Sequence, residues 1–351
     1  MKVVITGGGT GGHIYPALEV GRLAREQGAD LLYLGSLRGQ ESAICAQQGI
    51  AFQGFHSAPL YSLRTVRGWQ SLVGLLRSIG LAKNALRAAK PDIVFSTGGY
   101  SAAPVMSAAR SLRIPYAIHE ANSVPGRSNR MFGRQARAFT TTFRSTGGHR
   151  LGFPTIRTGH PIRAELRAAA HSVAREPRSI LVVGGSQGSA FLNETVPEAA
   201  RLLASGYQVL HASGRANFDA TAARAQGIEG YHVVPYLESA ELTEAYRTCT
   251  IAIGRSGGTL AEFAMFGLPS VLIPLPTSAD DHQLHNAREF EMMEASTVLP
   301  QSQASPQAIA DAIRGWTEAP ARCERAAVAL REWDVPDATQ RILANLLGAN
   351  K

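Results

Sequence analysis

The residues with the clearest chemical potential form four glycine-rich segments. The first, TGGGTGGH at 6–13, ends in a histidine, and the others are STGGYSAAP at 96–104, GGSQGSAFLN at 184–193 and GRSGGTLAE at 254–262. Backbone N–H groups at the start of a helix can bind an anion or a sugar hydroxyl. One such loop is better explained by tight packing of a strand on a helix, but four at the same edge favour a ligand site.

Each glycine-rich segment follows a short apolar run and precedes a stretch compatible with a helix. These runs are residues 3–5, 93–95, 180–183 and 251–253. Strand, glycine turn and helix form the repeating unit of a parallel, doubly wound sheet. The sequence therefore predicts an α/β fold with two Rossmann-like doubly wound domains that face each other across a cleft, where the carboxyl ends of the strands bind ligands.

The proline-containing stretch GHPIRAEL at 159–166 separates the two series of strands. We predict an N-terminal domain over residues 1–160 and a C-terminal domain over 161–335. The final stretch, PDATQRILANLL from Pro336, has helical spacing, and we expect residues 336–351 to pack back on the first domain. A length of 351 residues with 45% hydrophobic residues suits two domains.

Several classes of protein are disfavoured by composition. No run of about 18 apolar residues predicts a transmembrane helix, and the N-terminus does not read as a secretion signal. Cys45, Cys249 and Cys323 are far apart and lack CxxC spacing. A reduced, cytoplasmic protein without structural zinc or disulfides is the expectation.

Two nucleotide-binding motifs fit the first glycine-rich segment only in part. Its glycines satisfy GxGxxG, but the next strand, LLYLGS at 31–36, ends in Gly35 and Ser36 where a dinucleotide site needs an acidic residue. His13 and Ile14 stand where a Walker loop needs lysine and a hydroxyl. A nicotinamide oxidoreductase is therefore disfavoured, and a general site for an anion or sugar remains.

Charge is distributed unevenly along the chain. Residues 1–160 contain 19 Lys and Arg against 6 Asp and Glu, a net charge of +13, whereas residues 161–351 contain 16 against 21, a net charge of −5. A basic half suggests contact with a polyanion or an anionic surface, although ordinary solubilising charge explains it equally well.

The stretch WQSLVGLLRSIGLAKNALR at 69–87 has apolar residues at helical spacing followed by basic ones. Such a helix can lie on an anionic bilayer. On the sequence alone, however, a helix packed on its own sheet is the better explanation. Gly74 and Gly80 weaken any helix in this stretch.

Six motifs in order resemble the MurG family of bacterial N-acetylglucosaminyltransferases. They are TGGGTGGHIYP, STGGYSAAP, HEANSVPG, GHPIR, GGSQGSAFLN and DDHQLHNA, and they extend over nearly the whole chain. The resemblance implies a GT-B glycosyltransferase that converts lipid I into lipid II during peptidoglycan synthesis. The donor would be UDP-N-acetylglucosamine, and the acceptor the muramic acid 4-hydroxyl of an undecaprenyl-linked pyrophosphate. The new linkage would be β-1,4, formed with inversion.

The same resemblance sets the expected partners and location. Beside UDP-N-acetylglucosamine and lipid I, we expect an anionic membrane surface, with the protein bound peripherally on the cytoplasmic face. The lipid tail of the acceptor favours membrane contact through the basic half. No cofactor, metal or nucleic acid is expected.

For the C-terminal half, the resemblance implies a donor site. Ser186 and the loop 257–260 would meet the phosphates, which agrees with helix N-terminal amides stabilising a departing UDP. Glu262 would accept the ribose hydroxyls, since a carboxylate can take both. The backbone of Leu237 would address the uracil, although a leucine at this position is expected in the core in any case. Gln283 would read sugar hydroxyls, and Arg163 would contact the donor.

For the N-terminal half, Thr10, Gly11 and Gly12 would lie near the reacting centre, and Asn122 would hold a sugar or acceptor group. Inversion in one displacement needs a base for the acceptor proton. His13 and Glu120 are the two candidates, and the sequence does not separate them.

The loop from Arg255 to Glu262 is one residue shorter than is usual in the family. The assignments of Gly258, Thr259 and Leu260 can therefore shift by one position, whereas Glu262 keeps its register with GLP at 267–269. Two rival functions remain. One is another UDP-sugar enzyme, such as a UDP-N-acetylglucosamine 2-epimerase, and the other is a non-catalytic module for anionic lipid.

Overall fold

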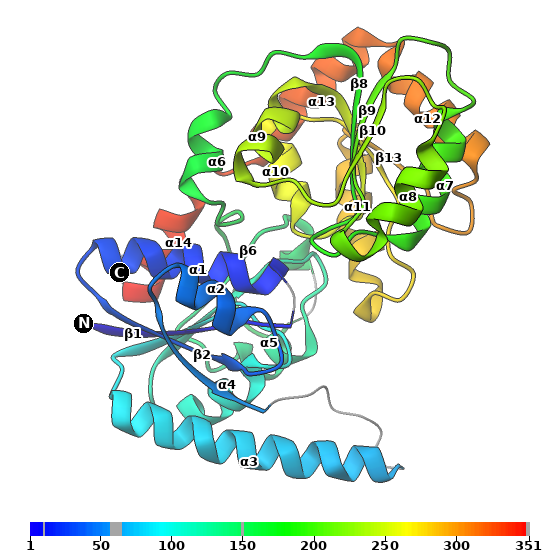
Figure 1. Cartoon of the computed structure of the whole chain (residues 1–351). Helices are drawn as coiled ribbons and strands as arrows, with labels where there is room; N and C mark the ends of the chain where they lie inside the picture. Colours follow the sequence, from blue (N-terminus) through cyan, green and yellow to red (C-terminus); the bar gives the residue numbers. More distant parts are fainter. Residues whose placement is uncertain (10, 57–64, 149–150, 349–351) are drawn as a thin grey trace. The chain divides into compact units, whose positions relative to one another are not determined.

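A computed structural model describes residues 1–9, 11–56, 65–148 and 151–348 (Figure 1). The chain divides into two compact units. The N-terminal unit comprises Met1–Ile162 and Asp337–Lys351, and the C-terminal unit comprises Arg163–Pro336. Thr10, one of the expected substrate contacts, lies outside the described residues.

The N-terminal unit is built on a seven-stranded sheet in the order β3-β2-β1-β4-β5-β6-β7, and all its paired strands run parallel. The strands are β1 (Lys2–Thr6), β2 (Asp30–Ser36), β3 (Ala51–Phe55), β4 (Ile93–Ser96), β5 (Tyr116–Glu120), β6 (Ala138–Thr141) and β7 (Ile156–Arg157). The helices are α1 (Gly11–Glu26), α2 (Glu41–Gln47), α3 (Val66–Ala89), α4 (Ala102–Ser111), α5 (Arg127–Gly133) and α14 (Ala338–Leu347), with a short 3-10 turn, η1 (Ser145–Gly148).

Alternation along β1 divides the core of this unit into two layers. Successive side chains of a strand point to opposite faces. Val3 and Ile5 belong to a cluster with buried residues of α1, α2 and α14, and Val4 belongs to a second cluster with residues of α3, α4 and α5. Because helices cover both faces, the strands are apolar throughout, as expected for a parallel sheet.

The last described helix, α14, returns to the N-terminal unit. Its Ile342, Leu343 and Leu346 are buried in the same cluster as α1, and the two helices lie side by side in Figure 1. The chain therefore enters the C-terminal unit after Ile162 and leaves it after Pro336.

The C-terminal unit repeats the architecture with a six-stranded parallel sheet in the order β10-β9-β8-β11-β12-β13. The strands are β8 (Glu176–Val183), β9 (Gln208–Ala212), β10 (Tyr231–Val234), β11 (Cys249–Gly254), β12 (Ser270–Leu272) and β13 (Ser296–Val298). The helices are α6 (Ala164–Ala169), α7 (Ala190–Ala200), α8 (Phe218–Ala225), α9 (Ser239–Thr248), α10 (Thr259–Phe266), α11 (His282–Met292), α12 (Pro306–Thr317) and α13 (Pro320–Trp333), with 3-10 turns η2 (Arg215–Asn217) and η3 (Ala279–Asp281).

Helices also cover both faces of this second sheet. Helix α7 packs against α8 and α12, and α10 packs against α9 and α13, on opposite sides of the sheet in Figure 1. In both units the first six strands follow the order 3-2-1-4-5-6 of the Rossmann fold, in which ligands bind beyond the carboxyl ends of the strands. The predicted α/β fold with two Rossmann-like domains is confirmed. None of the helices in the described residues is long and apolar enough to cross a bilayer.

Candidate functional site

The first glycine-rich loop packs directly on its own neighbours. A Cβ atom at Gly7 would lie 1.8 Å from Thr97 Oγ1, and one at Gly8 would lie 2.1 Å from Glu41 Oε1. Gly99 has φ +87°, and a Cβ there would lie 2.1 Å from the carbonyl oxygen of Gly8. These glycines are therefore required by close contact with the loop after β4 and with the side chain of Glu41, whatever ligand approaches them.

Glu41 is a buried carboxylate beneath this loop that the sequence did not reveal. Its side chain is fully buried, and Oε1 accepts a hydrogen bond from Gly9 N at 3.3 Å. Tyr33 supports the same loop, since its hydroxyl donates to the carbonyl oxygen of Gly7. An acidic residue in the first turn of a helix is common, so nothing in the sequence distinguished Glu41 from an ordinary capping residue.

His13 is held in one tautomer by the loop after β4. Its Nδ1 lies 2.8 Å from the carbonyl oxygen of Thr97, and Thr97 Oγ1 donates to the carbonyl oxygen of His13 at 2.7 Å. A carbonyl oxygen only accepts, so in the neutral ring Nδ1 carries the proton and Nε2 carries the lone pair. The ring is partly exposed. This is the tautomer that a general base needs if Nε2 takes the proton.

Glu120, the other candidate base, is committed to its own loop. The carboxylate is 1% exposed and accepts four hydrogen bonds. Oε1 accepts from Asn122 N at 2.9 Å and from Asn122 Nδ2 at 3.2 Å. Oε2 accepts from Gly126 N at 2.9 Å and from Asn129 Nδ2 at 2.8 Å. The side chain thus fixes the turn from β5 into α5.

This network extends to the other loops of the N-terminal unit. Gly98 has φ +90°, and a Cβ there would lie 2.8 Å from the amide atoms of Asn129. His119, which precedes Glu120 in β5, is fully buried and hydrogen-bonds Thr140 Oγ1 and Thr142 Oγ1, each at 3.0 Å. Burial, with a smaller contribution from His160, lowers the pKa of His119 well below its ordinary value. His119 is therefore a neutral structural residue.

In the C-terminal unit, the loop after β8 contains one glycine that internal packing requires and one that faces open space. Gly188 has φ +76°, and a Cβ there would lie 1.8 Å from the carbonyl oxygen of Ser213, so internal packing requires it. Gly185 has φ +92° and no neighbouring atom within 4 Å of a Cβ, and Ser186 beside it is exposed. Ser189 caps α7 by accepting from Leu192 N at 3.4 Å. Open space therefore lies at 185–186, where a ligand can approach.

The loop after β11 is similarly open at one glycine. A Cβ at Gly257 would meet no atom within 4 Å. Gly258 and Thr259 are partly exposed at the start of α10, whereas the side chain of Leu260 is fully buried and its N–H donates to the carbonyl oxygen of Gly257 at 3.2 Å. Of the three assigned residues, Gly258 and Thr259 offer the more accessible groups.

Glu262 lies in the first turn of α10 and is partly exposed. Its Oε2 accepts a hydrogen bond from the Tyr246 hydroxyl at 2.6 Å. Burial raises the pKa of Glu262, while the Tyr246 hydrogen bond and the charge of Arg163 act in the opposite direction. Arg163, at the position before α6, is thereby placed in the electrostatic surroundings of Glu262.

Arg255 has a structural role in the open loop. Its Nη1 donates to the carbonyl oxygens of Ile273 at 2.9 Å and Pro274 at 3.1 Å, and its Nη2 donates to Gln301 Oε1 at 2.9 Å. Burial lowers the pKa of Arg255. The guanidinium thus joins the loops after β11, β12 and β13.

Two further expected donor contacts, Gln283 and Leu237, have side chains that are partly or wholly engaged within the protein. Gln283 Oε1 accepts from Leu275 N at 3.0 Å, so its amide nitrogen is the group that can donate to a ligand. The side chain of Leu237 is 6% exposed and belongs to the core, so a contact with a ligand there would use its backbone.

The expected site residues divide between the two units. All the described ones except Arg163 lie at the end of a strand, in the loop after it or in the first turn of the next helix. The N-terminal unit carries Gly11, Gly12, His13, Glu120 and Asn122, and the C-terminal unit carries Arg163, Ser186, Leu237, Gly258, Thr259, Leu260, Glu262 and Gln283.

Comparison with known proteins agrees with this architecture. Residues 3–141 match the glycosyltransferase family 28 N-terminal domain, and residues 179–342 match the glycosyltransferase family 28 C-terminal domain. A UDP-N-acetylglucosamine–N-acetylmuramyl-(pentapeptide) pyrophosphoryl-undecaprenol N-acetylglucosamine transferase from Symbiobacterium thermophilum is 37% identical, with 99% of this chain and 96% of the relative covered.

Solved structures give the same result. The crystal structure of MurG from Acinetobacter baumannii has a TM-score of 0.79 and 28% identity, and the match covers 99% of both chains. A putative UDP-N-acetylglucosamine 2-epimerase from Listeria monocytogenes has a TM-score of 0.70 at 15% identity, with 99% of this chain and 96% of that chain covered. At that identity the likeness to the epimerase shows the fold alone.

The fold and these matches define a two-domain α/β glycosyltransferase of the GT-B type. The chain belongs to glycosyltransferase family 28 and, within it, to the MurG family, which confirms the resemblance seen in its motifs.

Proposed function

We propose that the protein transfers N-acetylglucosamine from UDP-N-acetylglucosamine to the 4-hydroxyl of N-acetylmuramic acid in lipid I and thereby forms lipid II. The substrates are those named for the MurG relatives, and the observation that supports the chemistry is the hydrogen bond of His13, whose Nδ1 lies 2.8 Å from the carbonyl oxygen of Thr97. A glycosyltransferase that inverts configuration in one displacement needs such a base at the acceptor hydroxyl.

The proposed step is a single displacement at the anomeric carbon of the donor sugar. The acceptor 4-oxygen forms a bond to the anomeric carbon of the donor sugar as the bond from that carbon to the UDP phosphate oxygen breaks. The acceptor proton moves to His13 Nε2, and the electron pair leaves with UDP. Backbone amides at the starts of α7 and α10 stabilise the growing phosphate charge. His13 rather than Glu120 is assigned as the base, because the oxygens of Glu120 already accept four hydrogen bonds.

The C-terminal unit would hold the donor. The open positions beside Ser186 and Gly257 suit the phosphates. Glu262 suits the ribose hydroxyls, since it is partly exposed and its other contacts hold it in place. The backbone of Leu237 would address the uracil, and the amide nitrogen of Gln283 and the guanidinium of Arg163 would meet the rest of the donor.

The activity is tested with labelled UDP-N-acetylglucosamine and a short-chain lipid I analogue. We expect a β-1,4-linked disaccharide product and a roughly 10- to 100-fold loss of kcat/KM in Glu262→Ala, because a hydrogen bond to a charged group is lost. Glu229→Ala, which removes an exposed carboxylate of the same unit, is the matched control. Conversion of the donor to UDP and an epimerised sugar without disaccharide would instead support the epimerase function.

Helix α3 supports a second part of the proposal, which is peripheral attachment to the cytoplasmic face of the membrane. Trp69, Val73 and Leu76 are 59%, 46% and 60% exposed. On a helix of 3.6 residues per turn they share one face, and Lys83 and Arg87 continue that face. The opposite side of α3 packs in the core through Ala82, Ala85 and Leu86. An apolar stripe followed by cations suits an anionic bilayer.

Membrane attachment is tested by sedimentation with vesicles. Leu76→Glu is expected to lower binding to anionic vesicles at least about tenfold. The change removes apolar area that the bilayer would bury, and the added carboxylate is repelled by the anionic lipids. Leu81→Glu is the matched control, since Leu81 is 54% exposed on the same helix but lies off the stripe. Equal binding by both variants would contradict attachment through this face, as would equal binding of the wild type to anionic and neutral vesicles.

A further inference from the structure

We propose that Tyr246 is a positioning residue that holds the Glu262 carboxylate in the orientation in which it accepts the ribose hydroxyls of the donor nucleotide. This inference rests on the donor-binding part of the proposed function and adds a residue that none of the sequence motifs contains. Tyr246 would act through Glu262, because its side chain is only 1% exposed whereas Glu262 is partly exposed.

The hydrogen bond between the two side chains is short and directional. The Tyr246 hydroxyl donates to Glu262 Oε2 at 2.6 Å. A hydrogen bond with one ionised partner is stronger than one between neutral groups. With a lone pair of Oε2 engaged by Tyr246, the carboxylate cannot rotate freely, and we assign Oε1 to the ribose hydroxyls.

The tyrosine ring is fixed by the helix that carries its partner. The ring centroid of Tyr246 lies 5.9 Å from that of Phe263, nearly edge-on at 78°, and 5.3 Å from that of Phe266. Both phenylalanines belong to α10, as Glu262 does. Helix α10 therefore presents the carboxylate and also supports the hydroxyl that orients it.

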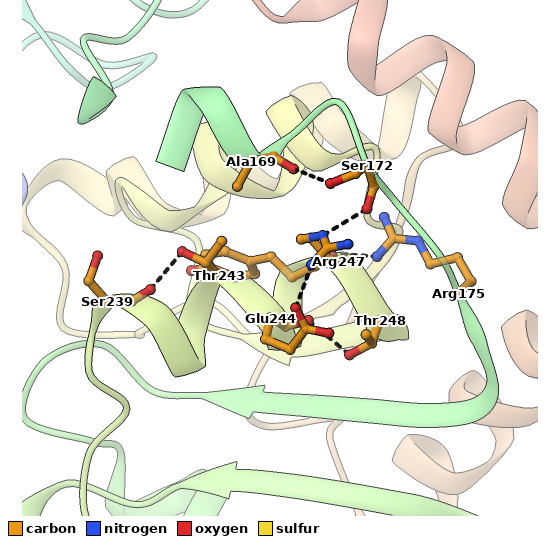
Figure 2. Close-up of polar contacts among 9 residues, drawn as sticks. Ala169, Ser172, Arg175, Ser239, Thr243, Glu244, Arg247 and Thr248 are labelled. Atoms are coloured by element: carbon orange, nitrogen blue, oxygen red, sulfur yellow. Dashed lines mark hydrogen bonds and ion pairs between the residues drawn. The ribbon is translucent and has the colours of Figure 1, made fainter. Parts of the chain in front are cut away.

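The backbone of α9 is fixed as well. Arg175 Nη1 donates to the carbonyl oxygens of Tyr246 at 2.5 Å and Cys249 at 2.8 Å, and its Nη2 donates to that of Phe266 at 2.6 Å. Figure 2 shows the neighbouring contacts, in which Arg247 Nε donates to the carbonyl oxygen of Ser172 at 2.7 Å. The tyrosine is therefore anchored through its ring and its main chain.

The same hydrogen bond favours the ionised form of Glu262. Burial raises the pKa of this carboxyl group, whereas Tyr246 from α9 and Arg163 ahead of α6 lower it. Burial, the charge of Glu262 and the hydrogen bond to it raise the pKa of Tyr246 well above its ordinary value, Tyr236 contributes slightly, and Arg163 opposes them. The tyrosine thus stays a protonated donor, and only an ionised Glu262 keeps all its remaining lone pairs available for hydroxyl groups.

Tyr246→Phe removes the hydroxyl and keeps the ring. By calorimetry at pH 7 we expect the Kd for UDP to rise about tenfold. Glu262→Ala should weaken UDP binding by at least as much, and the double variant should bind UDP no more weakly than Glu262→Ala alone, because coupled residues are not additive. In transfer assays the KM for UDP-N-acetylglucosamine should rise with little change in kcat.

Two readouts separate positioning from a merely structural role. Without the hydrogen bond the pKa of Glu262 rises. As the pH is lowered, UDP affinity should therefore begin to fall at a higher pH in Tyr246→Phe than in the wild type. The ratio of the Kd for the 2′-deoxy analogue of UDP to the Kd for UDP should also be smaller in Tyr246→Phe than in the wild type. Tyr207→Phe is the matched control, because its hydroxyl makes a 2.9 Å hydrogen bond to Thr317 Oγ1 in the same unit, and it should change neither readout.

Three results would overturn the inference. The first is unchanged UDP binding in Tyr246→Phe. The second is a loss of UDP affinity on adding Tyr246→Phe to Glu262→Ala that equals the loss caused by Tyr246→Phe in the wild type. The tyrosine would then act by a route other than Glu262. The third is UDP binding by Glu262→Ala that equals the wild type. That result would remove the donor-site assignment itself, and it is distinguishable from the first two because it needs no change at Tyr246.

Discussion

His13→Ala is expected to lower kcat for transfer by roughly 10²- to 10⁴-fold, the range that a general base contributes. The affinity for UDP should stay within about twofold, because the proposed donor contacts belong to the other unit. The physical reason is the hydrogen bond from Nδ1 to the carbonyl oxygen of Thr97, which leaves Nε2 as the basic atom. Single-turnover transfer and calorimetry with UDP measure the two quantities.

His171→Ala provides the control for this experiment, since His171 is an exposed histidine outside the proposed site. Transfer by His13→Ala at near the wild-type rate would mean that another group takes the acceptor proton. Glu120 would then be the remaining candidate among the residues that the sequence proposed.

Glu120→Gln is expected to lower the free energy of unfolding of the N-terminal unit by about 3 kcal/mol, the upper end for buried donors left without their charged acceptor. Glutamine keeps one accepting oxygen and turns an NH₂ group toward two of the four N–H donors. The main-chain amides of Asn122 and Gly126, which donate to Glu120 at 2.9 Å each, should exchange faster with solvent. Urea unfolding and amide hydrogen exchange measure both effects.

The same variant distinguishes the two roles considered for Glu120. If Glu120 served only as a base, Glu120→Gln would lower the transfer rate without lowering the free energy of unfolding. If Glu120 holds the loop, the variant lowers both quantities. Glu26→Gln, at an exposed carboxylate on α1, should change stability by no more than about 0.5 kcal/mol. Unchanged exchange of the two amides in Glu120→Gln would contradict the loop-holding role.

The repeating units of the fold were predictable because their signals are local. The apolar run before Gly7, the glycines and the following helix are contiguous in sequence, and the same pattern recurs before Gly184. The partners of the site residues are different in kind. Glu41 meets Gly9 from 32 positions away, and His13 meets Thr97 from 84 positions away. Such pairs depend on the order of strands in the sheet, which periodicity does not encode.

The glycines illustrate the same limit. Sequence reasoning left two explanations open for every glycine-rich segment, a ligand or tight packing. The structure divides them by position. Gly7, Gly8 and Gly188 are required by neighbouring atoms of the protein itself, whereas Gly185 and Gly257 face open space. Composition alone cannot make this division, because both causes remove the same side chain.

The return of α14 to the N-terminal unit has a consequence for biosynthesis. Ile342, Leu343 and Leu346 complete a cluster whose other members precede residue 139, and the whole C-terminal unit is translated between them. Domains are generally completed in the order in which the ribosome releases them. Here that order is reversed, since the unit that begins the chain must keep an apolar surface uncovered until the unit inserted within it has already emerged.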